Sequence, residues 1–282
     1  MSVTAEEFRA SPDLFAETGA LGRLCRFGLA TRGNTSLEAD AVLEAVERGV
    51  NYLNWCEHAD GLQAAVRQLG KRRQSVCLAV QLSARSADGA RKELDGFLQA
   101  LDTDYVDVVT YYYVEHLQEW EQILARGGAA ETLEASRSAG QIRAIGLTSH
   151  QRPLAARAAA SGRLDLLMTR YNAAHRGAEK DVFPVTTEHN ISVVAFTCLR
   201  WGALLESTPD DPHRFRVPAA ADWYRFVLCH PAVTVALMAP NGIGEFRQNL
   251  KLLDDWRGCS SDEYASLKAH GDRVHRHGGS FP

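Results

Sequence analysis

The chain has 282 residues, of which 45% are hydrophobic and 23% charged, with a formal net charge of -4 and a pI near 6.2. This composition is ordinary for a soluble globular protein, and the length suits one large domain. The weakly acidic charge gives no general attraction to nucleic acid, and no apolar run reaches the roughly 18 residues of a membrane span. Because Met1 to Ala10 lacks a positive segment followed by an apolar one, we expect a cytoplasmic protein.

Eight short apolar segments, rich in Val, Ile and Leu, alternate with helical patterns along the chain. Such segments favour buried strands of a parallel sheet with helices outside it. Eight units predict a single (β/α)8 TIM barrel, a fold that typically needs about 250 residues. We expect one domain over 1–282, with an N-terminal extension at 1–24 and a C-terminal helix and tail at 259–282. The predicted strands are Cys25 to Thr31, Tyr52 to Trp55, Val76 to Gln81, Tyr105 to Tyr111, Ala144 to Thr148, Leu164 to Tyr171, Ser192 to Thr197 and Val233 to Met238.

The segments between these strands predict helices and two long loops. Ser36 to Ala39 has the pattern of a capped helix start, and Gly49 ends that helix. Another helix is predicted over Ala87 to Leu101, where leucines keep helical spacing. The connections Tyr112 to Gly127 and Arg200 to Asp222 are long and polar, and in a barrel such loops cover the carboxyl ends of the strands, where active sites lie.

The six cysteines are widely spaced and include no C-x-x-C pair, so they give no pattern for an iron–sulfur cluster or a structural zinc. Four of them lie in predicted strands or at strand ends, where a thiol behaves as a small hydrophobic group. The histidines lack the tight spacing of a helical metal site. We therefore expect buried thiols and no metal.

Three segments resemble motifs of the aldo-keto reductases. Gly49 to Cys56 is similar to G-[VI]-N-[FY]-[IL]-D-T-A, Leu101 to Tyr112 is similar to L-x-T-D-Y-[IV]-D-L-x-x-[IL]-H, and Val76 to Gln81 occupies the place of the strand that ends in the family's catalytic lysine. The resemblance implies the family's barrel without its catalytic tetrad. Asn54 stands at the aspartate, Gln81 at the lysine, Tyr112 at the histidine, and Ala59 or Asp60 at the tyrosine.

The resemblance also implies where a nicotinamide cofactor would contact the chain. Ser149 falls on the residue that holds the nicotinamide amide, Phe196 on the ring that stacks on it, and Asn249 on the residue that contacts adenine. The glutamine that also holds that amide is Met168 here, and Glu245 would repel a 2′-phosphate. We therefore expect no cofactor, with NADP or NAD as the alternative. The similar segments are Gly140 to Ser149, Arg170 to Asn172, Val194 to Leu204 and Arg247 to Leu250.

The replaced residues bear directly on the chemistry. In the family, a lysine lowers the pKa of the tyrosine that protonates the forming alkoxide, so losing both removes that mechanism. Asn54 and Gln81 replace an ion pair with two amides that can hydrogen-bond each other, which avoids a buried unpaired charge costing about 3 to 5 kcal/mol. Without a lysine beside it, Tyr112 is expected to donate a hydrogen bond, or to form an aromatic pocket wall, rather than to shuttle protons.

Polar residues gather at the predicted carboxyl ends of the strands. Glu57-His58 and Glu115-His116 each place a carboxylate beside an imidazole, a pair that can act as acid and base near neutral pH or simply be solvated. Arg170 and Arg200 can clamp a carboxylate or phosphate, or pair with acids of neighbouring loops. The predicted catalytic residues are His58, Glu57 and Tyr112. The predicted substrate-binding residues are Asn54, Gln81, Glu115, His116, His150, Arg170, Asn172, Arg200 and Trp201.

Three functions fit these patterns. The first is an enzyme that performs non-redox acid/base chemistry on a small polar molecule at the carboxyl face of the barrel. The second is an NAD(P)-dependent oxidoreductase with a rearranged proton donor, and the third is a non-catalytic binding or regulatory barrel. In each case we expect a small-molecule ligand rather than nucleic acid or a membrane, and the sequence leaves the oligomeric state and the substrate open.

Overall fold

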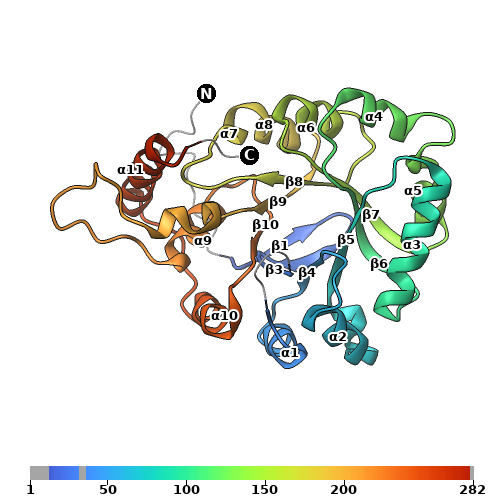
Figure 1. Cartoon of the computed structure of the whole chain (residues 1–282), viewed down its shortest axis with the longest axis horizontal. Helices are drawn as coiled ribbons and strands as arrows, with labels where there is room; N and C mark the ends of the chain where they lie inside the picture. Colours follow the sequence, from blue (N-terminus) through green and yellow to red (C-terminus); the bar gives the residue numbers. More distant parts are fainter. Residues whose placement is uncertain (1–12, 32–35, 280–282) are drawn as a thin grey trace.

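The computed structural model describes residues 13–31 and 36–279. Eight parallel strands close into a barrel in the order β10-β3-β4-β5-β6-β7-β8-β9, with helices around the outside (Figure 1). The predicted (β/α)8 barrel is therefore confirmed. The barrel strands are β3 (Phe27–Thr31), β4 (Tyr52–Trp55), β5 (Cys77–Leu82), β6 (Val106–Tyr111), β7 (Ile142–Thr148), β8 (Leu166–Arg170), β9 (Ser192–Phe196) and β10 (Val235–Met238).

Every predicted strand overlaps the strand that forms, and β4 has the predicted ends. β3 starts later than predicted because Cys25 pairs with Phe15 in a preceding hairpin rather than with the barrel. β8 stops at Arg170, one residue early, because the backbone then turns and Asn172 bridges His175. The differences lie at element ends, where chain-local patterns carry the least information.

The hairpin, β1 (Phe15–Thr18) and β2 (Gly22–Cys25), was not predicted. Its strands have four residues each and mix apolar with charged side chains, so they show little alternation. Leu21 and Leu24 nevertheless pack with the residues that fill the barrel interior. We expected residues 1–24 to be an N-terminal extension, and the part of it from residue 15 instead forms this hairpin, with Leu21 and Leu24 at one end of the barrel interior.

The helices follow the strands in the alternation that the sequence predicts. The helix over Ala87–Leu101 has the predicted bounds, whereas the first helix begins at Ala39 after an N-cap, Glu38, whose side chain makes no capping bond. The expected cap at Ser36 is therefore wrong. The helices are α1 (Ala39–Glu47), α2 (Gly61–Gln68), α3 (Ala87–Leu101), α4 (Leu117–Leu124), α5 (Ala129–Ser138), α6 (Arg152–Ala159), α7 (Ala178–Asp181), α8 (Phe183–Glu188), α9 (Ala220–Leu228), α10 (Gly242–Leu250) and α11 (Ser261–His277), with 3-10 turns η1 (Gly70–Ser75), η2 (Arg200–Leu205) and η3 (Lys251–Leu253).

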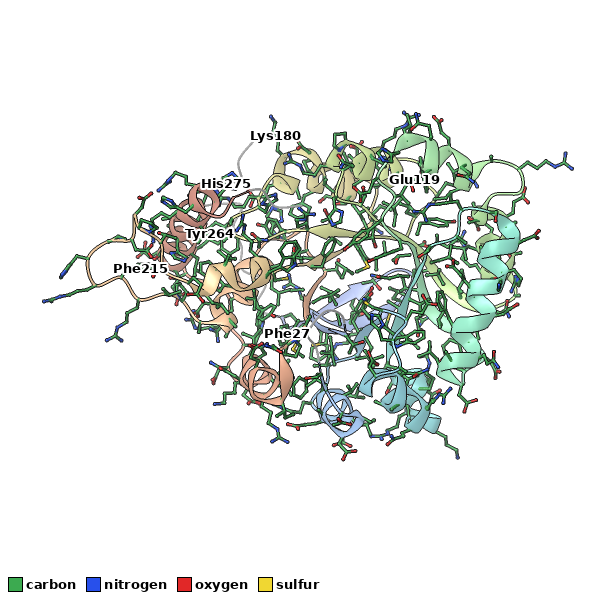
Figure 2. The ribbon with its side chains drawn as sticks, in the orientation of Figure 1. Phe27, Glu119, Lys180, Phe215, Tyr264 and His275 are labelled. Carbon is green, nitrogen blue, oxygen red and sulfur yellow. The ribbon has the colours of Figure 1, made fainter. Side chains whose placement is uncertain are left out.

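Apolar side chains form one layer between strands and helices and a smaller cluster inside the barrel. Figure 2 shows how the side chains fill the space around the strands, with Phe27 on β3 and Tyr264 on α11. The Tyr264 ring stacks on Phe226 of α9 at 4.6 Å, which packs α11 against α9. Five of the six cysteines are buried, as expected, and Cys56 is partly exposed. Within residues 13–31 and 36–279 no helix is long and apolar enough to cross a membrane.

Candidate functional site

A cavity of about 610 Å³ opens at the carboxyl ends of the barrel strands. Its floor follows from the two-residue period of a strand, because every second side chain points into the barrel. On β4, Tyr52 fills the interior and Asn54 reaches the cavity; on β5, Ala79 and Gln81 have the same relation. The inward side chains that line the floor are Ala30, Asn54, Gln81, Thr148, Met168, Phe196 and Leu237.

The two amides on this floor do not bond to each other. Asn54 donates from Nδ2 to Cys56 Sγ at 3.3 Å, and Gln81 Nε2 lies 4.0 Å from Met168 Sδ. The strand register explains this correction, since Asn54 lies opposite Ala79 and Gln81 is two residues further along. The buried Oδ1 of Asn54 has no hydrogen-bond partner in the described part of the chain, so it is an acceptor available to a ligand.

Tyr113, rather than the predicted Tyr112, lines the cavity. The backbone of Tyr113 has φ 42°, and this left-handed turn after β6 carries its ring over the cavity, while the Tyr112 ring stacks on it at 4.1 Å. The phenol that the sequence predicted in the pocket is therefore displaced by one residue. Tyr112 supports the cavity wall from behind Tyr113.

No lysine is among the described residues that line the cavity. Lys71 lies in η1 and Lys92 in α3, and neither residue is among those that line the cavity. Tyr224, the second tyrosine of the cavity, comes from α9, and burial raises its pKa well above the usual value, with the nearby Cys198 and Glu245 adding to the effect. Its hydroxyl is therefore a poor proton donor.

Glu57 and His58, two of the predicted catalytic residues, are exposed and do not line the cavity. Glu57 has φ 60°, which turns the chain away after β4, and the carbonyl of His58 accepts a 2.7 Å hydrogen bond from Trp55 Nε1. This contact fixes the loop with its side chains toward solvent. The expectation that this pair faces the pocket is corrected.

The carboxylate–imidazole pair at the cavity joins two different loops. Glu115, after β6, has Oε1 3.0 Å from Nδ1 of His150, after β7, and the same oxygen accepts the His150 backbone amide at 2.9 Å. Both side chains are about three-quarters buried, with 24% exposed. His116, the sequence neighbour expected to pair with Glu115, is instead exposed at the start of α4.

Three rings stand side by side along this wall. His150 lies between Tyr113, at 4.4 Å, and Phe196, at 5.8 Å between ring centroids. All three side chains line the cavity. The imidazole is thus in contact with two aromatic rings as well as held by Glu115, which fixes its orientation.

Arg170, at the end of β8, is half-buried and lines the cavity, and burial lowers its pKa although Tyr113 and Glu115 raise it. Arg200 is different: it is 5% exposed and donates to the carbonyl of Gly278 at 2.8 Å, so it holds the end of α11 in place. Trp201, 67% exposed, forms the rim. Asn172 is buried and bonds Thr197 O at 2.9 Å, a structural role.

Some of the residues implied as cofactor contacts line the cavity, and others are buried away from it. Phe196 lines the cavity, whereas Ser149 is buried and its Oγ accepts the amide of Gln151 at 3.0 Å, and Asn249 is buried in α10. Thr148 lines the cavity, and its buried hydroxyl has no hydrogen-bond partner in 13–31 and 36–279. The period of β7 could have identified Thr148 as the inward residue. Glu245 lies at the far rim and accepts the amide of Asn241 at 2.7 Å.

No group of three or more potential metal ligands occurs among the described residues. The cavity presents an aromatic wall, an imidazole held by a carboxylate, and an arginine. It also presents two buried polar atoms that have no hydrogen-bond partner in the part of the chain that the structure describes, Asn54 Oδ1 and Thr148 Oγ1. Such a site can bind a small polar molecule and move protons.

Comparisons with known proteins agree with the fold. The sequence model of the Aldo/keto reductase family matches residues 24–234. The uncharacterized oxidoreductase YrpG of Bacillus subtilis is 22% identical over 83% of this chain and 88% of its own, and a D-threo-aldose 1-dehydrogenase of a Pseudomonas species is 28% identical over 49% of this chain and 43% of its own.

Solved structures extend this likeness to the whole barrel. The apo form of aldo-keto reductase AKR11C1 from Bacillus halodurans has a TM-score of 0.73 at 18% identity, covering 91% of this chain and 95% of that one. An aldo/keto reductase from Klebsiella pneumoniae, in complex with NADP and acetate, has a TM-score of 0.74 at 20% identity and covers 92% and 96%. At these identities the structural match shows a shared fold alone. The family model, which matches residues 24–234, shows that the chain belongs to the aldo/keto reductase family.

Proposed function

We propose that this barrel transfers protons to and from a small polar molecule at its mouth, with His150 as the acid and base. The observation that carries the proposal is the double contact of Glu115 Oε1 with the amide and Nδ1 of His150. An ionised carboxylate accepts hydrogen bonds and donates none, so it fixes the proton of a neutral imidazole on Nδ1. Nε2 then carries the lone pair that can take a proton from a substrate.

The proposed step is proton exchange at a carbon next to a carbonyl. Nε2 of His150 takes the proton, the electron pair of the C–H bond forms a C=C bond, and the π pair of the carbonyl moves to its oxygen to give an enolate. The protonated His150 then returns a proton to carbon while the carbonyl forms again. This step consumes no oxidant or reductant. Arg170, which lines the same cavity, stabilises the negative oxygen, and the buried Oδ1 of Asn54 accepts a hydroxyl or amide hydrogen of the substrate.

The test is deuterium exchange followed by proton NMR. The protein is incubated in D2O with a panel of small keto acids, hydroxyketones and sugars, and we expect loss of the α-proton signal for one class. His150→Gln is expected to abolish exchange without unfolding, and His189→Gln, an exposed histidine at the end of α8, is the matched control. Exchange that survives in His150→Gln would contradict the proposal.

A second candidate function, NAD(P)-dependent oxidation or reduction with His150 as the relocated proton donor, is favoured by the cavity floor. The Phe196 ring and the buried hydroxyl of Thr148 fit a nicotinamide ring and its amide. A bound nicotinamide would supply hydride, and His150 would hold or release the proton at the carbonyl oxygen. The expectation that no cofactor binds has no support from the comparisons, since one neighbour is a complex with NADP.

Titration with NADH and NADPH separates the two candidates. Binding followed by nicotinamide fluorescence, together with oxidation of the reduced cofactor by an aldehyde, supports the second function. Deuterium exchange in the absence of any nicotinamide supports the first.

A further inference from the structure

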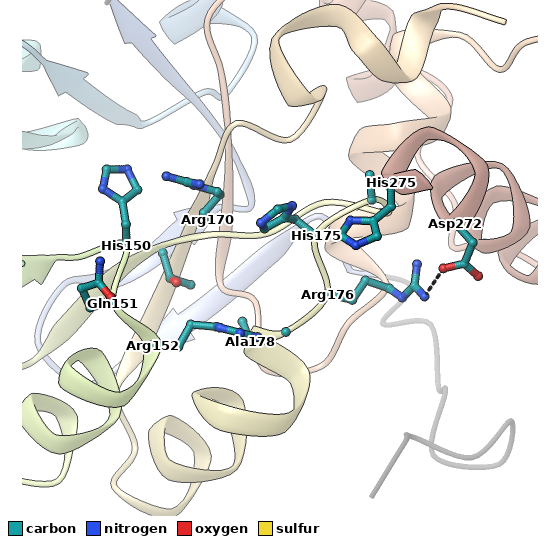
Figure 3. A pocket seen from close by; sticks show the side chains of 12 residues that line it. His150, Gln151, Arg152, Arg170, His175, Arg176, Ala178, Asp272 and His275 are labelled. Atoms are coloured by element: carbon teal, nitrogen blue, oxygen red, sulfur yellow. Dashed lines mark hydrogen bonds and ion pairs between the residues drawn. The ribbon is translucent and has the colours of Figure 1, made fainter. Parts of the chain in front are cut away.

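A second cavity, of about 580 Å³, lies beside the central one and is shown in Figure 3. The segments that follow β7 and β8 form it together with α11. His150 and Arg170 line both cavities. A molecule that spanned both cavities would therefore pass these two side chains.

Half of the described residues that line the chamber are arginines or histidines. The described lining includes three arginines, three histidines and a single carboxylate, Asp272. Anions are the ligands that such a lining favours, because guanidinium groups donate charge-assisted hydrogen bonds to oxyanions. The six residues are Arg152, Arg170, Arg176, His150, His175 and His275.

Two of the arginines are fixed in position by the protein. Arg176 donates to Asp272 on α11 at 2.6 Å, the contact marked in Figure 3, and Arg152 pairs with Asp181 at 3.1 Å. The Arg152 guanidinium also lies directly on Gly177, where an added Cβ would come within 1.2 Å of its Nη1. The absence of a side chain at 177 is what admits the guanidinium there. These contacts orient the donors before any ligand arrives.

The burial of His175 and the positive charges around it both affect the pKa of this imidazole. Burial, then the charges of Arg170, His275, Arg200 and Arg152, lower the pKa of His175 to about 4. The chamber thus disfavours a further positive charge, and the same positive potential favours the binding of an anion.

We propose that this side chamber binds an oxyanion, a phosphate or carboxylate group carried by the molecule that His150 acts on. That the anion and the group on which His150 acts belong to one molecule rests on the proposed function. The binding of an oxyanion in the chamber does not depend on that function. Arg152, Arg170 and Arg176 would hold the anion.

The test follows histidine C–H resonances of the full chain during titration with inorganic phosphate and, separately, with acetate. We expect saturable shifts of His175 and His275, identified by their Gln variants, in the millimolar range. Arg152→Gln removes a charged donor and should weaken binding about tenfold. Gly177→Ala should do the same by displacing the Arg152 guanidinium, because the residue has φ -57° and its backbone accepts alanine. Arg157→Gln, exposed on α6 and outside the chamber, is the matched control and should bind as the wild type does.

Preference for phosphate or for acetate assigns the class of the anion. Absence of saturable shifts with both ions, or equal weakening in Arg152→Gln and Arg157→Gln, would overturn the inference. Failure of the proposed function looks different: phosphate or acetate still binds the chamber, and no molecule of the panel exchanges its proton. His150→Gln is expected to lose exchange while His175 and His275 still respond to the anion.

Discussion

Glu115 and His150 lie 35 residues apart in the sequence, yet one carboxylate oxygen contacts both the backbone amide and Nδ1 of the histidine, at 2.9 and 3.0 Å. The two residues follow neighbouring strands, β6 and β7, so the barrel itself brings the loops together. Because the amide anchors the oxygen, the imidazole cannot turn without losing its partner. The pair is thus oriented in the absence of substrate.

Removing this carboxylate should impair catalysis more than stability. In Glu115→Ala the imidazole loses the group that fixes its proton on Nδ1, and we expect proton exchange to fall by about 100-fold or more. The measurement is the exchange rate of the responsive compound by NMR. Glu121→Gln, an exposed carboxylate on α4, is the control. A wild-type rate in Glu115→Ala would show that orientation by Glu115 does not matter to the reaction.

Asp107 should contribute strongly to the stability of the barrel. Its buried carboxylate bonds Arg73 and Arg143, each at 2.9 Å, and accepts the amide of Leu78 on the neighbouring strand at 2.9 Å. Asp107→Ala leaves Arg73 buried without this partner, and we expect a loss of about 3 to 5 kcal/mol in the free energy of unfolding. Urea denaturation measures it, and Asp104→Asn, exposed just before β6, should change stability little. A loss under 1 kcal/mol on the same scale would contradict this role.

His230 should make the fold sensitive to acid. Burial lowers the pKa of this imidazole, which packs on Phe183 at 4.5 Å, to about 4. The unfolded chain, with a pKa near the ordinary 6.5, then binds the proton first. The contribution of the neutral His230 to the free energy of unfolding is therefore fully present above about pH 6.5. It is lost as the pH falls toward 4, by up to about 3 kcal/mol.

His230→Asn is the variant that checks this. Asparagine can still accept the amide of Ala232, which His230 Nδ1 accepts at 3.2 Å, but it does not titrate. The unfolding free energy of the variant should fall less between pH 6.5 and 4 than that of the wild type. Parallel pH profiles for the two proteins would assign the acid sensitivity to other groups.

The barrel could be predicted because its signals are local. Strand runs such as Tyr52–Trp55 and the helix Ala87–Leu101 show their period within a few residues, and eight repeats leave little choice of topology. The same period places Asn54 and Gln81 inside the barrel. The hairpin at residues 15–25 was not predicted because its short strands show little alternation. They are stabilised by packing against the residues of the barrel interior.

The site was harder to predict because it is assembled across loops. Glu115 was expected to pair with its neighbour His116, but sequence adjacency places side chains on different sides of a turn, and the partner came from the next loop. The left-handed backbone at Tyr113 moved the cavity phenol by one residue. Arg200 was expected to bind a ligand and instead binds backbone carbonyls at the end of α11, a contact 78 residues away. Such pairings are set by tertiary structure alone.

The rim residue Glu245 should set the preference between the two nicotinamide cofactors if either binds. Its carboxylate is exposed beside the cavity, and no lysine or arginine other than Arg170 is among the described lining residues. A carboxylate repels a 2′-phosphate and can accept a ribose hydroxyl, so we expect tighter binding of NADH than of NADPH. Glu245→Gln should narrow the difference by raising the affinity for NADPH, measured by nicotinamide fluorescence. Glu188→Gln, an exposed carboxylate at the end of α8, is the control for net charge, and tighter binding of NADPH than of NADH by the wild type would contradict the prediction.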